Sequence, residues 1–90
     1  MIGIDPGMSG GICIVSDETG KIILCTPMPV IGNELDLKSL CILLHSHQSH
    51  GVCIEQSQAM PKNGAVSMFR YGTGYGMLRG ASFALGFRTH

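Results

Sequence analysis

Two acidic residues each follow a short apolar run that is typical of a β-strand. Asp5 comes after Ile2-Gly3-Ile4 and opens a Pro-Gly turn, and Glu55 comes after Val52-Cys53-Ile54. A strand that ends in this way holds its carboxylate at the edge of a sheet, where metal or phosphate can approach bare backbone. Because paired carboxylates are ligands for hard divalent cations, the pattern predicts a metal site built from Asp5 and Glu55.

Three strands in the first part of the chain would place Asp5. We predict them over residues 1–5, 11–16 and 21–25, arranged as an antiparallel meander, with a turn at residues 17–20. The run from Ile12 to Val15 is apolar throughout, which is typical of a strand covered on both faces. We therefore expect helices above and below the sheet.

A crossover unit would then bring Glu55 beside Asp5. Residues 26–34 are predicted as a loop, because the two prolines in this stretch lack the backbone donor that a sheet needs. Apolar residues at helical spacing predict a helix from residue 35 or 37 to about residue 46, capped by Asn33 or Asp36. A strand over residues 52–55 follows the helix and is expected to run parallel to the first strand.

The last third of the chain is predicted as a loop and one long helix. Residues 56–64 form the polar loop, with Lys62 and Asn63 near its tip, and residues 65–84 form the helix. Three glycines recur every four residues in this helix and would lie on one stripe: Gly72, Gly76 and Gly80. A glycine costs about 1 kcal/mol in a helix interior, so the stripe predicts close approach of a sheet, a second helix or a partner chain.

Charge is divided unequally between the two parts of the chain. Residues 1–55 hold all six acidic residues with two lysines, a net −4, whereas residues 56–90 hold four basic residues and no acid, a net +4. An acidic strand-end site beside a basic segment fits a metal-dependent enzyme that acts on a polyanion such as DNA. The candidate DNA contacts are Lys62, Asn63, Arg70 and Arg79. A bulkier helix face, with Met68, Tyr71, Tyr75 and Leu78, is predicted either to pack in the core or to stack against DNA.

The cysteines and histidines do not form a metal motif. The four cysteines lie at positions 13, 25, 41 and 53, each inside an apolar run and without a Cys-x-x-Cys pair. This predicts small buried thiols in a reducing cytosol rather than zinc ligands or redox centres. His45, His47 and His50 do not share one helical face, so we expect a solvated helix end rather than a metal site.

Length and composition indicate one small domain. Ninety residues with 44% hydrophobic and 13% charged residues are typical of a compact apolar interior. A strand follows Met1 directly instead of a signal peptide, so a cytoplasmic location is expected. Arg70 and Arg79 interrupt the apolar stretch of residues 65–87, which argues against a membrane span.

Motifs along the whole chain carry a resemblance to a known family. They are Ile2-Gly3-Ile4-Asp5-Pro6-Gly7 with Gly10-Gly11, then Ile54-Glu55, then Ala59-Met60-Pro61 with Gly64, Ser67-Met68-Phe69, Gly72, Tyr75-Gly76 and Gly80. The aspartate motif is common, but the long segment from Glu55 to Gly80 is much more specific. Together they resemble the RuvC-type Holliday-junction resolvases, particularly the phage and prophage branch, within the ribonuclease-H-like superfamily.

The resemblance implies both a fold and an activity. The fold would be an α/β, ribonuclease-H-like mixed sheet with strands 1–3 antiparallel, strand 4 parallel to strand 1, and flanking helices. The activity would be that of a homodimeric nuclease that nicks four-way DNA junctions with two Mg²⁺ ions, for which Mn²⁺ can substitute. Carried over to this chain, Asp5 would bridge both metals and Glu55 would hold one of them, so that a water is activated and the leaving oxygen is stabilised.

The sequence departs from the family pattern after Glu55. The family also uses an acidic pair, or an acid with a histidine, on a C-terminal helix, and no acid follows Glu55 here. The remaining acids are predicted in the hairpin turn or near a helix start, and His90 is the last residue. We therefore expect residues 1–90 to be a single but incomplete N-terminal domain, truncated after the second long helix: a fragment, a truncated reading frame or a degenerate paralogue. The chain alone should cleave junctions little or not at all.

Two other functions remain open. The chain could be a non-catalytic module that binds DNA or dimerises through its basic, glycine-striped helix. Alternatively, Asp5-x-Gly7-x-x-Gly10 could be the phosphate loop of an actin-like or sugar-kinase-like ATPase. Those folds need a second phosphate motif and an adenosine motif that 90 residues do not supply, and calorimetry with ATP would test this alternative.

Overall fold

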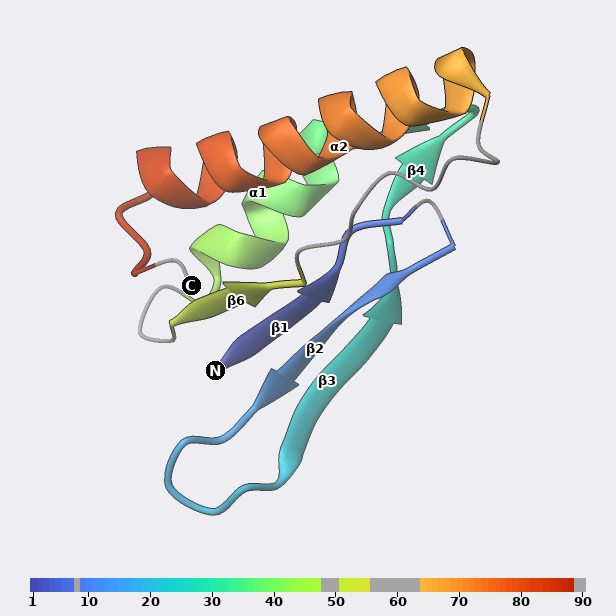
Figure 1. The fold of residues 1–90 in the computed structure, drawn as a ribbon. Coiled ribbons are helices and arrows are strands. Elements are labelled where there is room, and N and C mark those ends of the chain that lie inside the picture. The colour runs from blue at the N-terminus through green and yellow to red at the C-terminus, as the bar shows by residue number, and fades with distance from the viewer. Residues whose placement is uncertain (8, 48–50, 56–63, 89–90) are drawn as a thin grey trace.

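The computed structural model describes residues 1–7, 9–47, 51–55 and 64–88. Its main sheet has the strand order β3–β2–β1–β6 (Figure 1). The strands are β1 (Ile2–Asp5), β2 (Gly11–Val15), β3 (Ile22–Pro27) and β6 (Val52–Ile54). The first three pair antiparallel, and β6 pairs in parallel with β1. The predicted mixed sheet is confirmed.

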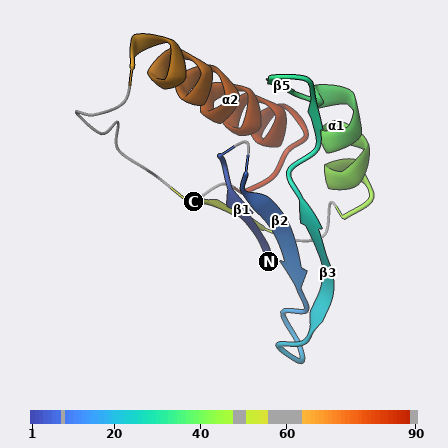
Figure 2. The same cartoon turned by 90° about the vertical axis from the view of Figure 1, so that its right-hand side faces the viewer.

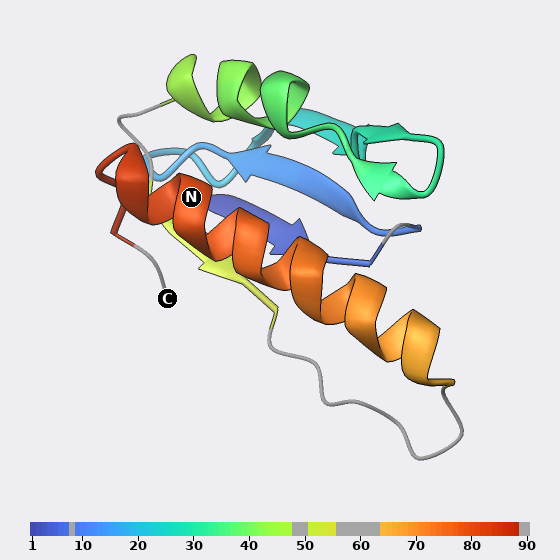
Figure 3. The ribbon, with the colours of Figure 1, turned by 90° about the horizontal axis from the view of Figure 1, so that it is seen from above.

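Two helices, α1 (Leu37–His45) and α2 (Ala65–Ala84), both cover the same face of this sheet (Figures 1 to 3). The core forms between the helices and the sheet. The strands contribute Ile2, Ile4, Ile12, Ile14, Val52 and Ile54, and the helices contribute Leu40, Leu44 and Leu78. The expectation of helices on both faces is wrong for the described residues. In β2 only Ile12 and Ile14 are buried, so the strand alternates in burial although its sequence is apolar throughout.

A second small sheet corrects the predicted loop at residues 26–34. The third strand extends to Pro27, and the chain then forms a hairpin from β4 (Val30–Ile31) and β5 (Glu34–Leu35). Gly32 has a φ of +60° and precedes Asn33, which gives the two-residue turn that joins the hairpin. The hairpin lies beside the N-terminal half of α2, near the carboxyl end of β1 (Figure 1).

Asp36 caps α1, as one of the two predicted capping residues. Its carboxylate accepts hydrogen bonds from the Ser39 backbone N–H (3.2 Å) and from the Ser39 hydroxyl (2.6 Å). The bond from the Ser39 hydroxyl has the larger effect and the bond from the Ser39 backbone the smaller, and both lower the pKa of Asp36 below its usual value.

Asp36 should therefore make stability depend on pH. Because the folded pKa is lowered, the stabilisation is present above the unfolded pKa of about 3.9 and is lost as pH falls through the folded pKa. Replacing Asp36→Ala should lower the urea midpoint at pH 7, and the difference from wild type should shrink as pH falls below 4. An equal difference at pH 2 and pH 7 would show that the carboxylate charge plays no part.

The cysteines differ from the prediction of four buried thiols. Cys13 and Cys25 face each other across β2 and β3 and form a disulfide, with their Cα atoms 4.2 Å apart. Cys41 is half-buried and Cys53 is exposed, both with free thiols. Among the described residues, no helix is long and apolar enough to cross a membrane.

Candidate metal centre and nucleic-acid face

The structure brings Asp5 and Glu55 to neighbouring strand ends. Ile4 of β1 is paired with Ile54 of β6, and each acid is the next residue along the chain. The parallel ladder continues through Glu55, whose backbone N–H donates to the Ile4 carbonyl at 2.9 Å. Because neighbouring strands lie about 4.8 Å apart, the two backbones are close enough for one cation to contact both carboxylates. Both residues are exposed, and strand alternation assigns them to the face opposite the buried Ile4 and Ile54.

The turn after Asp5 depends on a close approach of backbone to backbone. Asp5 Oδ1 accepts a long hydrogen bond from the Gly7 N–H (3.4 Å), and the Gly10 N–H donates to the Gly7 carbonyl (2.8 Å). A Cβ atom at Gly10 would collide with the Asp5 carbonyl. Glycine at position 10 therefore allows the chain to fold back over the end of β1 and present the Asp5 carboxylate.

The donor set fits a hard divalent cation in type but is small. Two exposed carboxylates supply the oxygen ligands that Mg²⁺ and Mn²⁺ prefer, and Mg²⁺ commonly keeps several waters. Within the described ranges no group of three or more His, Cys, Asp or Glu residues is placed to hold a metal. His45 is exposed in the last turn of α1, and Glu34 lies in the hairpin, so neither adds to the pair. Asp5 and Glu55 are thus the residues that would hold a metal here.

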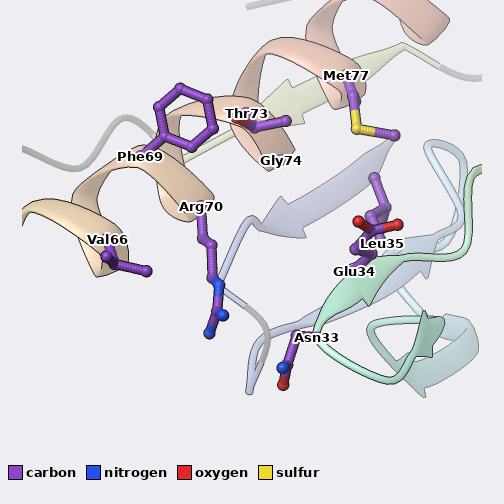
Figure 4. Close-up of a pocket in the computed structure, with 9 residues that line it drawn as sticks. All are labelled: Asn33, Glu34, Leu35, Val66, Phe69, Arg70, Thr73, Gly74 and Met77. Atoms are coloured by element: carbon purple, nitrogen blue, oxygen red, sulfur yellow. The ribbon is translucent and has the colours of Figure 1, made fainter.

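Arg70 lies on α2 beside the β4–β5 hairpin, in a groove of about 480 Å³. Its guanidinium extends away from the helix toward Asn33 at the hairpin tip (Figure 4). Glu34 and Phe69 also line this groove. In the part of the chain that the structure describes, neither Arg70 nor Glu34 forms an ion pair. Arg70 is therefore available for a phosphate, whereas Lys62 and Asn63 lie outside the described residues.

Arg79 lies on the opposite side of α2 from Arg70. Its guanidinium stands 5.9 Å from the ring centre of Tyr75, which in turn stacks on Tyr71 with ring centres 6.3 Å apart. Leu78 is fully buried and Tyr75 packs against the core, so core packing explains much of the predicted bulky face. Met68 is 40% exposed and does not belong to the core.

The glycine stripe lies on the open side of α2. A Cβ atom at Gly72, Gly76 or Gly80 would meet no other atom within 4 Å, so no described part of this chain approaches the stripe. The sequence predicts that a sheet, a second helix or a partner chain approaches the stripe. For the described residues, the predictions of a sheet and of a second helix of this chain are wrong. Two phenylalanines flank the stripe: Phe69 is 76% exposed and Phe83 is 81% exposed.

These phenylalanines are a surface feature beyond the residues predicted from the sequence. The sequence carries a signal for this face, because Gly76 lies seven residues from both Phe69 and Phe83. The three residues therefore fall on one helical face. An exposed face with large aromatics at its ends and glycines between them is typical of an interaction surface.

The strand order, with β6 parallel to β1, is that of a ribonuclease-H-like fold of the RuvC type, in which Asp5 is the last residue of β1 and Glu55 directly follows β6. Two of the solved structures that it resembles are of RuvC from Thermus thermophilus. One, in complex with a Holliday junction substrate, has a TM-score of 0.77 at 18% identity over 99% of this chain and 60% of that chain. A second Thermus thermophilus RuvC structure has a TM-score of 0.63 at 18% identity, over 100% of this chain and 62% of that one.

At this identity the likeness shows the fold, which confirms the structural part of the resemblance. This chain spans about three-fifths of the length of the RuvC chains that it matches. The comparison with protein-family profiles yields no match, and neither does the comparison with curated proteins.

Proposed function

We propose that this chain belongs to a magnesium-dependent, structure-selective endonuclease that resolves four-way DNA junctions. The observation that carries the proposal is the placement of Asp5 and Glu55 after paired positions of adjacent parallel strands, within a RuvC-type fold. The complex of one neighbour with a Holliday junction supports branched DNA as the ligand. The branch of the family, phage or prophage, follows only from the sequence motifs.

Each candidate residue has a defined role in this proposal. Asp5 and Glu55 hold divalent metal, which supplies an activated water and stabilises the leaving oxygen when it is bound. Arg70 contacts backbone phosphate from the groove beside the hairpin, and Lys62, Asn63 and Arg79 add further contacts. Because only two acids meet at the strand ends, further ligands must come from outside the described residues, and we expect little cleavage by residues 1–90 alone.

Junction binding tests the proposal directly. We expect the chain to bind a synthetic four-way junction at least tenfold more tightly than linear duplex of the same length in gel shifts with Ca²⁺. Arg70→Ala should weaken this binding severalfold and reduce its salt dependence, because one phosphate contact is lost. Arg88→Ala, an exposed arginine outside the predicted contacts, is the matched control. Equal affinity for junction and duplex would contradict the proposal.

A non-catalytic role is the second candidate, and it is favoured by the small number of acids at the site. Junction binding that is unchanged by EDTA and by Glu55→Gln would indicate this role. Robust Mg²⁺-dependent cleavage by the wild-type chain, lost in Asp5→Asn, would instead show that residues 1–90 hold a complete site.

We further propose that the open face of α2 is where a second copy packs in the complete, homodimeric protein. The face consists of Phe69, Gly72, Gly76, Gly80 and Phe83. Its glycines leave room for close helix approach, and its exposed aromatics supply apolar area.

Gly76→Ala should separate folding from association. In the monomer the new methyl group meets nothing, so helix propensity should raise the free energy of unfolding by about 0.5–1 kcal/mol. In a dimer the same methyl group separates the helices, so the apparent mass from analytical ultracentrifugation should fall toward that of a monomer. Gly20→Ala, at a turn with a φ of +73°, is the contrasting control, which should lower stability without changing association. A Gly76→Ala variant that associates as wild type does would exclude this face.

A further inference from the structure

Neither helix covers the second face of the main sheet (Figures 1 and 2), and the strand register gives one row of residues across this face. The strand register places Cys25 of β3 opposite Cys13 of β2, Cys13 opposite Gly3 of β1, and Gly3 opposite Cys53 of β6. Cys13 and Cys25 are joined as a disulfide, and Cys53 is an exposed free thiol. The next row toward the carboxyl end of β1 begins with Asp5, which is paired with Gly11.

We propose that the Cys13–Cys25 pair is an exchange site for low-molecular-weight thiols such as glutathione, and that its bond braces the turn that carries Asp5. The inference does not depend on the proposed nuclease function. Cys25 is exposed on β3, an edge strand whose residues from Ile22 to Cys25 are all exposed. A small thiol can therefore reach its sulfur without unfolding of the chain.

The exchange is a balanced two-electron reaction. A glutathione thiolate attacks Cys25 Sγ, the bond between the two cysteines breaks, and Cys13 leaves as a thiolate that takes up a proton. A second glutathione thiolate then attacks the mixed disulfide at the glutathione sulfur. Cys25 is released as a thiol, and glutathione disulfide is the oxidised product. The reverse sequence, starting from glutathione disulfide, forms the bond again.

Neither free cysteine can replace a member of this pair in the folded chain. Gly3 lies between Cys13 and Cys53, so their Cα atoms are about 10 Å apart, beyond the span of about 7 Å that a disulfide allows. Cys41 lies on α1, which packs on the opposite face of the sheet. Cys41 and Cys53 are therefore available as substitution sites that leave the pair intact.

The brace acts through the ends of β2 and β3. Within the main sheet β3 pairs only with β2, so the bond is the one covalent tie across this ladder in the described residues. Gly11 lies two residues before Cys13, Pro27 lies two residues after Cys25, and the two are paired. Beyond that pair, the Met28 N–H donates to the Gly10 carbonyl at 3.1 Å, and Gly10 closes the turn on Asp5. Loss of the bond should let β3 open more often and so release the Gly10–Met28 contact.

The test uses the double variant Cys41→Ser, Cys53→Ser, which retains only the proposed pair. After equilibration with glutathione disulfide and removal of the reagent, native titration with a thiol reagent should find no thiol. After reduced glutathione it should find two. Reduction should lower the melting temperature by about 10 °C and speed hydrogen exchange at the Met28 amide, whereas exchange at the Leu44 amide in α1 should change less.

Two controls keep the result interpretable. Adding Cys13→Ser and Cys25→Ser to the double variant leaves no cysteine, and this variant should melt at the same temperature in oxidised and reduced glutathione, which excludes a general effect of the buffer. Peptide mapping of wild type after native alkylation should find Cys53 labelled before reduction and Cys13 with Cys25 only after it. Two titratable thiols after glutathione disulfide treatment would overturn the exchange site. Equal melting temperatures and equal hydrogen exchange at the Met28 amide in the oxidised and reduced protein would overturn the proposal that the bond stabilises the turn that carries Asp5.

Discussion

Leu44→Ala is expected to destabilise the protein by about 2–5 kcal/mol, a large share of what a domain of this size has. Leu44 is fully buried in α1, where it belongs to the core cluster between the helices and the sheet. Removing the leucine side chain therefore loses buried apolar contacts and leaves a cavity in this cluster. Urea unfolding followed by circular dichroism measures the loss of free energy of unfolding. A variant that is incompletely folded at 25 °C would agree with the upper end of the expected range.

Ile42→Ala is the matched control for Leu44→Ala, because it removes aliphatic carbon from the same helix two residues away. Ile42 is 59% exposed, so little buried area is lost, and alanine improves the helix propensity. Its free energy of unfolding should stay within about 0.5 kcal/mol of wild type. Equal destabilisation by the two changes would mean that α1 does not pack on the sheet with the face that the structure shows.

The strand order and the placement of the two acids at strand ends could be predicted, because short local stretches of the sequence indicate both. Asp5 and Glu55 each end an apolar run, and one helix of suitable length separates the third strand from the strand that carries Glu55. A crossover of that kind places two strands in parallel, so their carboxyl ends meet at one edge of the sheet. The same local signals could not reveal further metal ligands.

The prolines at positions 27 and 29 obscure the β4–β5 hairpin in the sequence, because they favour a loop there. Pro27 is tolerated at the end of β3, since β3 is an edge strand and its outward side needs no backbone donor. The Gly32-Asn33 pair, which follows the apolar Val30-Ile31, is itself a hairpin signal. Its consequence for function is the groove beside Arg70, which the hairpin helps to form.

The disulfide and the open helix face depend on geometry that spacing alone does not give. Cys13 and Cys25 are twelve residues apart, but whether they face each other depends on the register that the turn between β2 and β3 sets. The glycine stripe indicates that α2 has a smooth face. Which way this face points depends on how Leu78 and Tyr75 seat the helix on the sheet.

If Asp5 and Glu55 form the proposed metal site, Asp5→Asn is expected to weaken divalent-metal binding at least tenfold, about 1.4 kcal/mol, because it removes one of the two carboxylates at the paired strand ends. Glu55→Gln should have a similar effect, and the double variant should bind no measurable metal. Titration with Mn²⁺ by electron paramagnetic resonance measures the affinity. The gain in melting temperature with Mg²⁺ should fall in parallel, because a ligand stabilises only the state that binds it.

The fold should survive Asp5→Asn, which makes the loss of metal attributable to the charge. The Asp5 side chain is exposed, and an asparagine oxygen can still accept the hydrogen bond from the Gly7 N–H. Removing one of two neighbouring negative charges also relieves repulsion, so the metal-free variant should melt no lower than wild type. Glu18→Gln, an exposed acid in the turn between β2 and β3, is the matched control and should leave metal affinity unchanged. If Glu18→Gln and Asp5→Asn weaken binding equally, the cation responds to net charge, and Asp5 with Glu55 does not form a site.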